Sequence, residues 1–189
     1  MGTLQVGGTT LGVKNTSTNK IDLSNASIGS DTVFPAGGTG NAISIAILLD
    51  EKGDNTDAGT STESFSQRTL NVQIDPDSIV SLDSNQFTLG SGTYLISWSA
   101  PAINSNQHQS QLYNITGSAP LRQGSAMYCH TSAIVLTRSE GSFIHEITSN
   151  NVYEIRHRVE VAQSSYGFGV GSTFGTNNIY TIVVIYKLK

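Results

Sequence analysis

Histidines are the side chains of this chain with the most direct potential for metal or acid–base chemistry. There are four, His108, His130, His145 and His157, and the strand and turn pattern places each on a different element. The chain contains no His-x-His pair, no His-Glu-x-x-His motif and no serine in a Gly-x-Ser-x-Gly frame. Paired carboxylates on facing strands, which a glycan-cleaving enzyme would need, do not stand out either. We therefore predict a protein that is not an enzyme and that holds no cofactor.

One acidic loop has the residue types that could bind calcium. Its side chains are Asp50, Glu51, Asp54, Asn55 and Asp57, and calcium prefers carboxylate and amide oxygens as ligands. The loop lacks the Asp-x-Asp-x-Asp-Gly frame of a dedicated calcium loop. A solvated turn is the favoured interpretation, and the sequence leaves open whether the loop binds an ion.

His157 is set apart by its neighbours in the segment VYEIRHRVEVA. In a strand it shares one face with Tyr153, Ile155 and Val159, whereas the charged side chains of the segment lie on the other face. The favoured interpretation is a buried neutral imidazole with a hydrogen-bond partner. A metal ligand or a pH switch near a subunit interface is the alternative.

Period-two alternation indicates that β-strands position these side chains. Phe87 and Leu89 alternate with polar residues, and Tyr94, Ile96 and Trp98 do so after a Gly-Ser-Gly break. Similar segments bounded by turn residues continue from residue 42 to the end, and none shows a helical period with caps. The sequence predicts an all-β fold, an antiparallel β-sandwich of jelly-roll-like type.

The last segment, IYTIVVIYKLK, is apolar on both faces of its predicted strand. A strand of this kind must be covered on both sides, and the expected second cover is another copy of the chain. The predicted subunit interface consists of Tyr180, Ile182, Val184 and Tyr186, with His157 close to it.

Residues 1–40 differ from the rest of the chain. Their apolar residues come in short alternating pairs, separated by polar and glycine-rich stretches: Leu4 and Val6, Leu11 and Val13, Ile21 and Leu23. Each pair could form a very short strand, but together they bury too little surface to order a monomeric segment. We predict an extended attachment arm over residues 1–40 that self-associates or docks on another protein, with plain disorder as the alternative. The sandwich domain, called the knob below, is predicted over residues 41–189.

The composition limits the classes of partner. Only 13% of the residues are charged, the formal net charge is -4 and the isoelectric point is about 5.4, so we expect no nucleic-acid partner. No apolar run approaches the roughly 20 residues that a membrane-spanning helix needs. The first residues, MGTLQVGGTT, lack the pattern of a signal peptide. We expect a protein made in a cytoplasm and released by lysis.

Several segments resemble a known group of proteins. The run TLNVQIDPDSIVSLDSNQFTLGSGTYLISWSAPA, with NQHQSQLYNIT, YEIRHRVEVAQSSYGFGVGSTFG and the final strand, resembles the distal domain of tailed-bacteriophage fibre and virion proteins. Phe87, the segment Gly92–Tyr94 and the apolar last strand are similar to the tumour-necrosis-factor and complement globular-head jelly roll. The resemblance implies a homotrimeric virion protein whose terminal strands lie near the threefold axis.

The expected role is host-surface attachment by a tail-fibre knob that the arm holds to other virion proteins. A capsid-decoration or short head-fibre protein is one alternative, and a secreted lectin-like carbohydrate-binding module is another. The expected recognition surface consists of loops 50–66 and 103–125, because loops at the end of a sandwich are free to vary. The predicted contacts to a host glycan are Asn104, Asn106, Gln107, His108, Gln109 and Tyr113, whose polar groups match sugar hydroxyls. The alternative is that HQSQLYNI is a strand with solvated glutamines.

Overall fold

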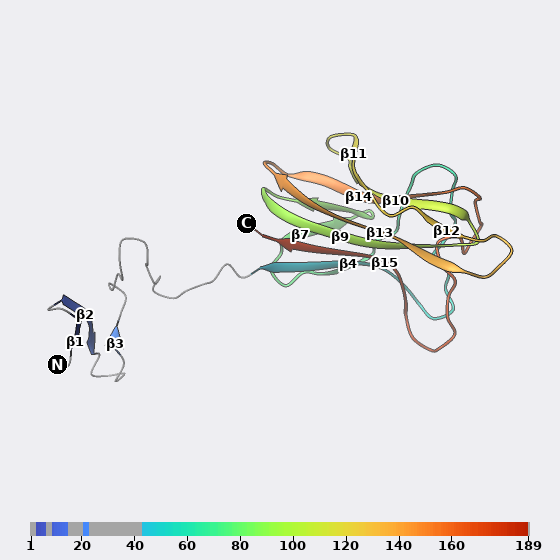
Figure 1. The fold of residues 1–189 in the computed structure, drawn as a ribbon. Coiled ribbons are helices and arrows are strands. Elements are labelled where there is room, and N and C mark those ends of the chain that lie inside the picture. Colours follow the sequence, from blue (N-terminus) through green and yellow to red (C-terminus); the bar gives the residue numbers. More distant parts are fainter. Residues whose placement is uncertain (1–2, 7–8, 15–20, 23–42, 189) are drawn as a thin grey trace. The chain divides into compact units, whose positions relative to one another are not determined.

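The computed structural model describes residues 3–6, 9–14, 21–22 and 43–188, and within these ranges every regular element is a β-strand (Figure 1). The chain divides into two compact units, Met1–Ala42 and Ile43–Lys189.

The first unit contains a three-stranded antiparallel sheet in the order β1-β2-β3. Its strands are β1 (Thr3–Val6), β2 (Thr9–Lys14) and β3 (Ile21–Asp22). The predicted arm residues Leu4, Val6, Leu11, Val13 and Ile21 lie on these strands, and Leu23 lies outside the described residues. The role of this unit in attachment stays a prediction.

The second unit is a sandwich of two antiparallel sheets that lie face to face (Figure 1). One is a seven-stranded sheet with the order β11-β10-β14-β8-β7, to which β12 adds beside β10 and β5 beside β14. Its strands are β5 (Ser66–Gln67), β7 (Val80–Asp83), β8 (Gln86–Leu89), β10 (Asn106–Asn114), β11 (Ala119–Gln123), β12 (Met127–Cys129) and β14 (Asn151–Val159).

The other layer is a five-stranded sheet with the order β13-β9-β15-β4-β6. Its strands are β4 (Ser44–Lys52), β6 (Val72–Ile74), β9 (Gly92–Ile103), β13 (Leu136–Ile147) and β15 (Asn178–Lys187). The start of β4 pairs with the end of β15, and long loops lie at the opposite end of the sandwich (Figure 1). The predicted fold class, an all-β antiparallel sandwich, is confirmed.

The period-two alternation explains the core between the two sheets. Tyr94, Ile96 and Trp98 point inward from β9 and are at most 3% exposed. Inward residues of both sheets complete the core, among them Leu48, Phe87, Leu89, Leu112, Tyr153, Ile155, Val183 and Ile185. The Trp98 indole donates a hydrogen bond to Ser110 Oγ at 2.9 Å and lies over Gly141, where an added Cβ would come within 2.0 Å of the ring. Glycine at position 141 therefore makes room for the indole.

Candidate functional site

The predicted recognition segment is largely strand rather than loop. Asn106–Asn114 forms β10, which pairs with β14 along its length and with β11 and β12 on its other edge. The prediction of a recognition loop over residues 103–125 is wrong, because the alternating polar residues are the outward side of a paired strand. Outward Gln107 is exposed, whereas inward His108 is 3% exposed and cannot act as an open surface contact.

One face of the Tyr113 ring is covered, so a sugar contact by Tyr113 stays a prediction. The Arg156 guanidinium carbon lies 3.4 Å from the centroid of the Tyr113 ring, so the cation covers one face of the ring. Asn104 has a positive φ of 52° and its carbonyl accepts a hydrogen bond from Gln163 Nε2 at 2.9 Å. Asn104 and Asn106 are half-buried. These three residues do not line the groove described next.

A groove of about 1100 Å³ brings together the other three predicted contacts, Gln107, His108 and Gln109. Below, this feature is called the β10–β12 groove. Its walls come from the loop after β4, from β10, from β12 and from the end of β14. The polar and aromatic side chains that line it are Glu63, Gln107, Gln109, Tyr128, Arg158 and Glu160, with His108 beneath them.

Tyr128 is the groove residue that sequence reasoning missed. It lies opposite Gln107 in the pairing of β12 with β10 and is 52% exposed. Its alternation with Met127 and with buried Cys129 would have placed it on an outer face. The strand is only three residues long, so the pattern was too short to single it out.

His108 and His157 form a buried pair beneath the groove. His108 Nδ1 lies 2.9 Å from His157 Nε2, and His108 Nε2 lies 2.7 Å from Thr137 Oγ1. Burial, and secondarily Arg68, lower the pKa of His108 to about 4, and burial lowers the pKa of His157 well below its usual range. Both imidazoles are therefore neutral near pH 7. The favoured interpretation of His157 fits, and its predicted place at a subunit interface is wrong, because it is fully buried in its own knob.

Arg68 completes this polar layer and was not predicted. Its side chain is fully buried; Nε donates to Thr181 Oγ1 at 2.9 Å and Nη1 donates to the Pro101 carbonyl at 3.1 Å. The guanidinium carbon lies 3.8 Å from the centroid of the Phe168 ring, which stacks on His157. Burial lowers the pKa of Arg68 to about 9, so the group remains a cation at pH 7. A cation beside two imidazoles disfavours their protonation.

Hydrogen bonds join the acidic loop to the glycine-rich loop before β15. Asp54 accepts a hydrogen bond from Gly175 N at 3.0 Å, and Asp57 accepts one from Gly171 N at 2.9 Å. Asp50 is buried, with the Lys52 ammonium 3.3 Å from its carboxylate. Among the described residues no group of three or more His, Cys, Asp or Glu side chains could hold a metal ion. The solvated-turn interpretation is wrong for Asp50, which is buried. The carboxylates of Asp54 and Asp57 join this loop to the glycine-rich loop before β15.

The outer face of the five-stranded sheet is mainly apolar, and β15 contributes three of the predicted interface residues to it. Ile182, Val184 and Tyr186 point outward, whereas Tyr180 is 4% exposed and donates from its hydroxyl to the Thr56 carbonyl at 2.7 Å. The prediction for Tyr180 is wrong because the register with β4 shifts between Ile179 and Ile182. An irregularity of this kind breaks the strict alternation, so Tyr180 does not share the face of Ile182.

The pairing registers arrange this outer face in three rows that cross the sheet. One row is Ile144, Leu95, Tyr186 and Ile45; the next is Ser142, Ser97, Val184, Ile47 and Ile74; the third is Glu140, Ser99, Ile182, Leu49 and Val72. Ile45, Ile74 and Ile144 are 41%, 52% and 63% exposed. Below, these rows are called the apolar face. The small serines leave a hollow of about 540 Å³ beside Ile182 and Val184.

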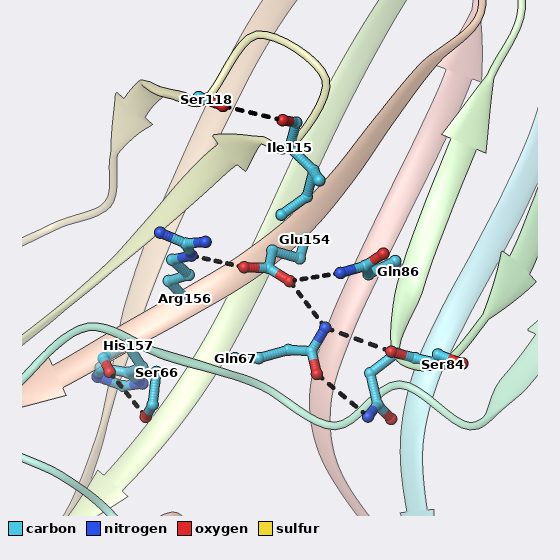
Figure 2. A network of polar contacts seen from close by, with 10 residues as sticks. Ser66, Gln67, Ser84, Gln86, Ile115, Ser118, Glu154, Arg156 and His157 are labelled. Atoms are coloured by element: carbon cyan, nitrogen blue, oxygen red, sulfur yellow. Dashed lines mark hydrogen bonds and ion pairs between the residues drawn. The ribbon is translucent and has the colours of Figure 1, made fainter.

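The outer face of the seven-stranded sheet is closed by its own polar side chains. Figure 2 shows the Glu154 carboxylate between Arg156, Gln86 and Gln67, which lie at 2.5, 3.1 and 2.7 Å. Glu154 is only 4% exposed although it points outward. The predicted charged side of this strand is therefore a hydrogen-bonded network that covers its own carboxylate.

Comparisons with known proteins bear on the fold. No protein-family model matches the chain, and no curated protein matches it. The crystal structure of murine APRIL at pH 5.0 is similar with a TM-score of 0.52 and 9% sequence identity, over 78% of this chain and 100% of that chain. The globular domain of zebrafish complement 1qA protein gives a TM-score of 0.46 at 11% identity, over 77% and 98% of the two chains. The first likeness supports a jelly-roll sandwich, and the predicted phage origin stays a prediction.

The described part of the chain contains no helix of the length and apolarity needed to cross a membrane.

Proposed function

We propose that this chain is a homotrimeric structural protein of a tailed-phage particle, without enzymatic activity. In this proposal the sandwich is a knob that attaches to the host surface, and residues 1–40 hold it to another virion protein. The protein is made in the host cytoplasm, is part of the virion and becomes extracellular on lysis.

The apolar face is the observation that carries the proposal. Its three rows cross four or five strands, which amounts to an area on the order of 400 Å² from the usual spacing of strands and residues. The area includes three serines and Glu140, and its size is typical of the largest apolar patch on a soluble protein, which is often an interaction site. Other apolar side chains of the knob are also exposed, among them Ile134 and Phe174 in loops. On this face, however, apolar residues of adjacent strands lie together in paired rows, which favours it as the part that needs a cover.

A second copy of the chain is the proposed cover. Ser142 and Ser97 lie together in the second row and the bulkier Val184, Ile47 and Ile74 follow, so the surface is uneven, with a hollow over the serines beside the bulkier residues. An uneven, mainly apolar surface whose three rows contain one charged residue, Glu140, is typical of the central part of a subunit interface. The stoichiometry of three rests on the resemblance of Phe87, Gly92–Tyr94 and the last strand to trimeric jelly rolls.

The assignment to a phage particle rests on the sequence resemblance and on the weakly charged surface. The test has two parts. Sedimentation of the purified chain should give about three times its 20.0 kDa mass, and labelled antibody should bind the tips of tail fibres in electron micrographs of the virion. A stable monomer at micromolar concentration would contradict the assembly, and label on the head would favour a decoration protein.

A further inference from the structure

We infer that the β10–β12 groove binds a saccharide without negative charge and that Tyr128 is its stacking residue. The inference rests on the proposed function for the biological source of the saccharide. The groove itself is defined by the structure alone.

The groove is a formed feature of the fold. β12 adds to the edge of β10 and pairs Gln107 with Tyr128, so these two side chains lie next to each other. Backbone bonds from Val159 N to the Thr62 carbonyl, 3.0 Å, and from Glu160 N to the Gln107 carbonyl, 2.7 Å, fix the opposite wall. Four separate segments are thus held around one space of about 1100 Å³. A site with this support is largely formed before a ligand arrives.

Tyr128 supplies the flat apolar surface that saccharide recognition needs. Half of its surface is open, and its ring makes an edge contact with His130 at a centroid distance of 6.2 Å. A tyrosine ring beside amide groups presents an apolar face and a polar edge together. The pyranose ring of a sugar has the same two kinds of surface, in its C–H face and its hydroxyls.

The polar lining offers donors and acceptors close together. Glu160 accepts a hydrogen bond from Gln107 N through one oxygen, at 3.2 Å, which orients the carboxylate. Gln109 donates from its side-chain nitrogen to the Gly124 carbonyl at 2.8 Å, which orients its amide. Amide and carboxylate oxygens accept hydrogen bonds from sugar hydroxyls, and amide nitrogens donate them. Bonds of this kind are short-ranged and depend on fixed geometry.

The charges in the groove determine the class of saccharide. Glu63 and Glu160 contribute two negative charges and Arg158 one positive charge, while the buried His108 is neutral near pH 7 because its pKa is lowered to about 4. The lining therefore has a net negative charge. It repels sialic acids and uronic acids and accepts neutral hexoses and N-acetylhexosamines. A peptide or an anionic polymer is the outcome that would overturn this assignment.

The test measures binding of the purified full chain to matched neutral and acidic oligosaccharides by calorimetry or NMR titration. We expect millimolar dissociation constants for at least one neutral oligosaccharide and at least tenfold weaker binding of its sialylated counterpart. Tyr128→Ala should weaken binding at least tenfold, and its melting temperature should match that of the wild type because the ring is exposed. Phe174→Ala removes an aromatic ring that is 85% exposed and lies outside the groove, and it should bind as the wild type does.

The outcomes separate this inference from the proposed function. Equal binding by Tyr128→Ala and wild type, no binding in the whole panel, or a preference for acidic saccharides would each overturn the inference. If the groove binds saccharide but the soluble chain never competes with adsorption of the virions that carry it, host attachment fails and the groove assignment stands. If the chain competes and Tyr128→Ala competes equally well, attachment stands and the groove assignment fails.

Discussion

The two outer faces of this sandwich differ in whether their outward side chains are covered within one chain. Both belong to antiparallel sheets whose inner faces share one core. On the seven-stranded sheet, outward Glu154 is bound by Arg156, Gln67 and Gln86, so the polar network covers itself (Figure 2). On the five-stranded sheet, the outward residues are mainly isoleucine, valine and leucine, and more than half of the surface of Ile74 and of Ile144 is open.

The outer face of the seven-stranded sheet is thus covered within the monomer, whereas the outer face of the five-stranded sheet is not. Antiparallel sheets commonly leave one face to water, and that face then alternates polar residues with the buried set. The seven-stranded sheet follows that rule. The five-stranded sheet departs from it across three adjacent rows, and a departure shared by neighbouring strands indicates a partner rather than chance.

The largest expected effect comes from placing a charge on the apolar face. Val184→Glu should abolish trimer assembly, because association would bury a carboxylate among apolar side chains. Arg138, the cation beside the third row, is already bound to Ser99 Oγ and the Tyr180 carbonyl. Sedimentation velocity at micromolar concentration measures the loss. Val152→Glu is the matched control, since Val152 is half-buried and points outward from the seven-stranded sheet. A trimer that survives Val184→Glu, or one that only Val152→Glu breaks, would reverse the roles of the two faces.

The polar layer between the sheets predicts instability in acid. The unfolded chain binds a proton at His108 with a pKa near 6.5, and the folded chain does so only at about 4. Between pH 6.5 and pH 4, His108 is protonated in the unfolded state but not in the folded state. As the pH falls through this range, His108 therefore lowers the free energy of unfolding by about 3 kcal/mol. Below pH 4 the contribution of His108 no longer changes. His157, whose pKa is also lowered, reduces the free energy of unfolding in acid in the same way. Arg68 is the cation near both imidazoles and disfavours their protonation.

Denaturant unfolding at pH 7 and pH 4, at one protein concentration, checks this prediction. His108→Asn should lose part of the pH dependence, whereas His130→Asn, at an exposed position, should keep the wild-type slope. If both variants keep the wild-type pH dependence, other groups cause the acid sensitivity and the His108–His157 pair does not contribute.

The network on the seven-stranded sheet predicts a moderate loss of stability when its centre is removed. Glu154→Ala leaves Arg156, Gln67 and Gln86 without their shared acceptor and should lower the free energy of unfolding by about 2 kcal/mol. Glu146→Ala, at an exposed position on β13, is the control and should change it by no more than about 0.5 kcal/mol. Equal effects would mean that the network does not close this face.

The sequence predicted the sandwich because alternation alone decides which side chains point inward along uninterrupted strands. It put Tyr94 and Trp98 on one strand face, and Tyr153 and Ile155 on one face with His157, and all of these residues are buried. It failed for Tyr180, where a register shift interrupts the alternation. For the recognition segment it left a loop and a strand open, because a polar alternation looks the same in a solvated loop and on the outer side of a strand; the structure shows the strand.

The β10–β12 groove could not be predicted for a different reason. Its walls come from four segments between residues 63 and 160, and their meeting depends on β12 pairing with β10. Contacts between segments so distant in sequence leave no local pattern. Arg68 was missed likewise, because its partners Thr181 and Pro101 are far away in the chain.

The smallest expected effect concerns Tyr113, and it decides whether the closed face also takes part in recognition. Arg156 lies over the Tyr113 ring at 3.4 Å and is also bound to Glu154, so the ring is part of the network. Tyr113→Leu keeps most of the apolar contact and removes the cation–π attraction, which should cost about 0.5–1 kcal/mol of unfolding free energy. Denaturant unfolding measures this loss, and titration with the neutral saccharide that the wild type binds should give an unchanged dissociation constant. Unchanged stability with weaker saccharide binding would contradict both expectations: the ring would then be free to contact ligand, and the seven-stranded sheet would present a recognition surface rather than a closed one.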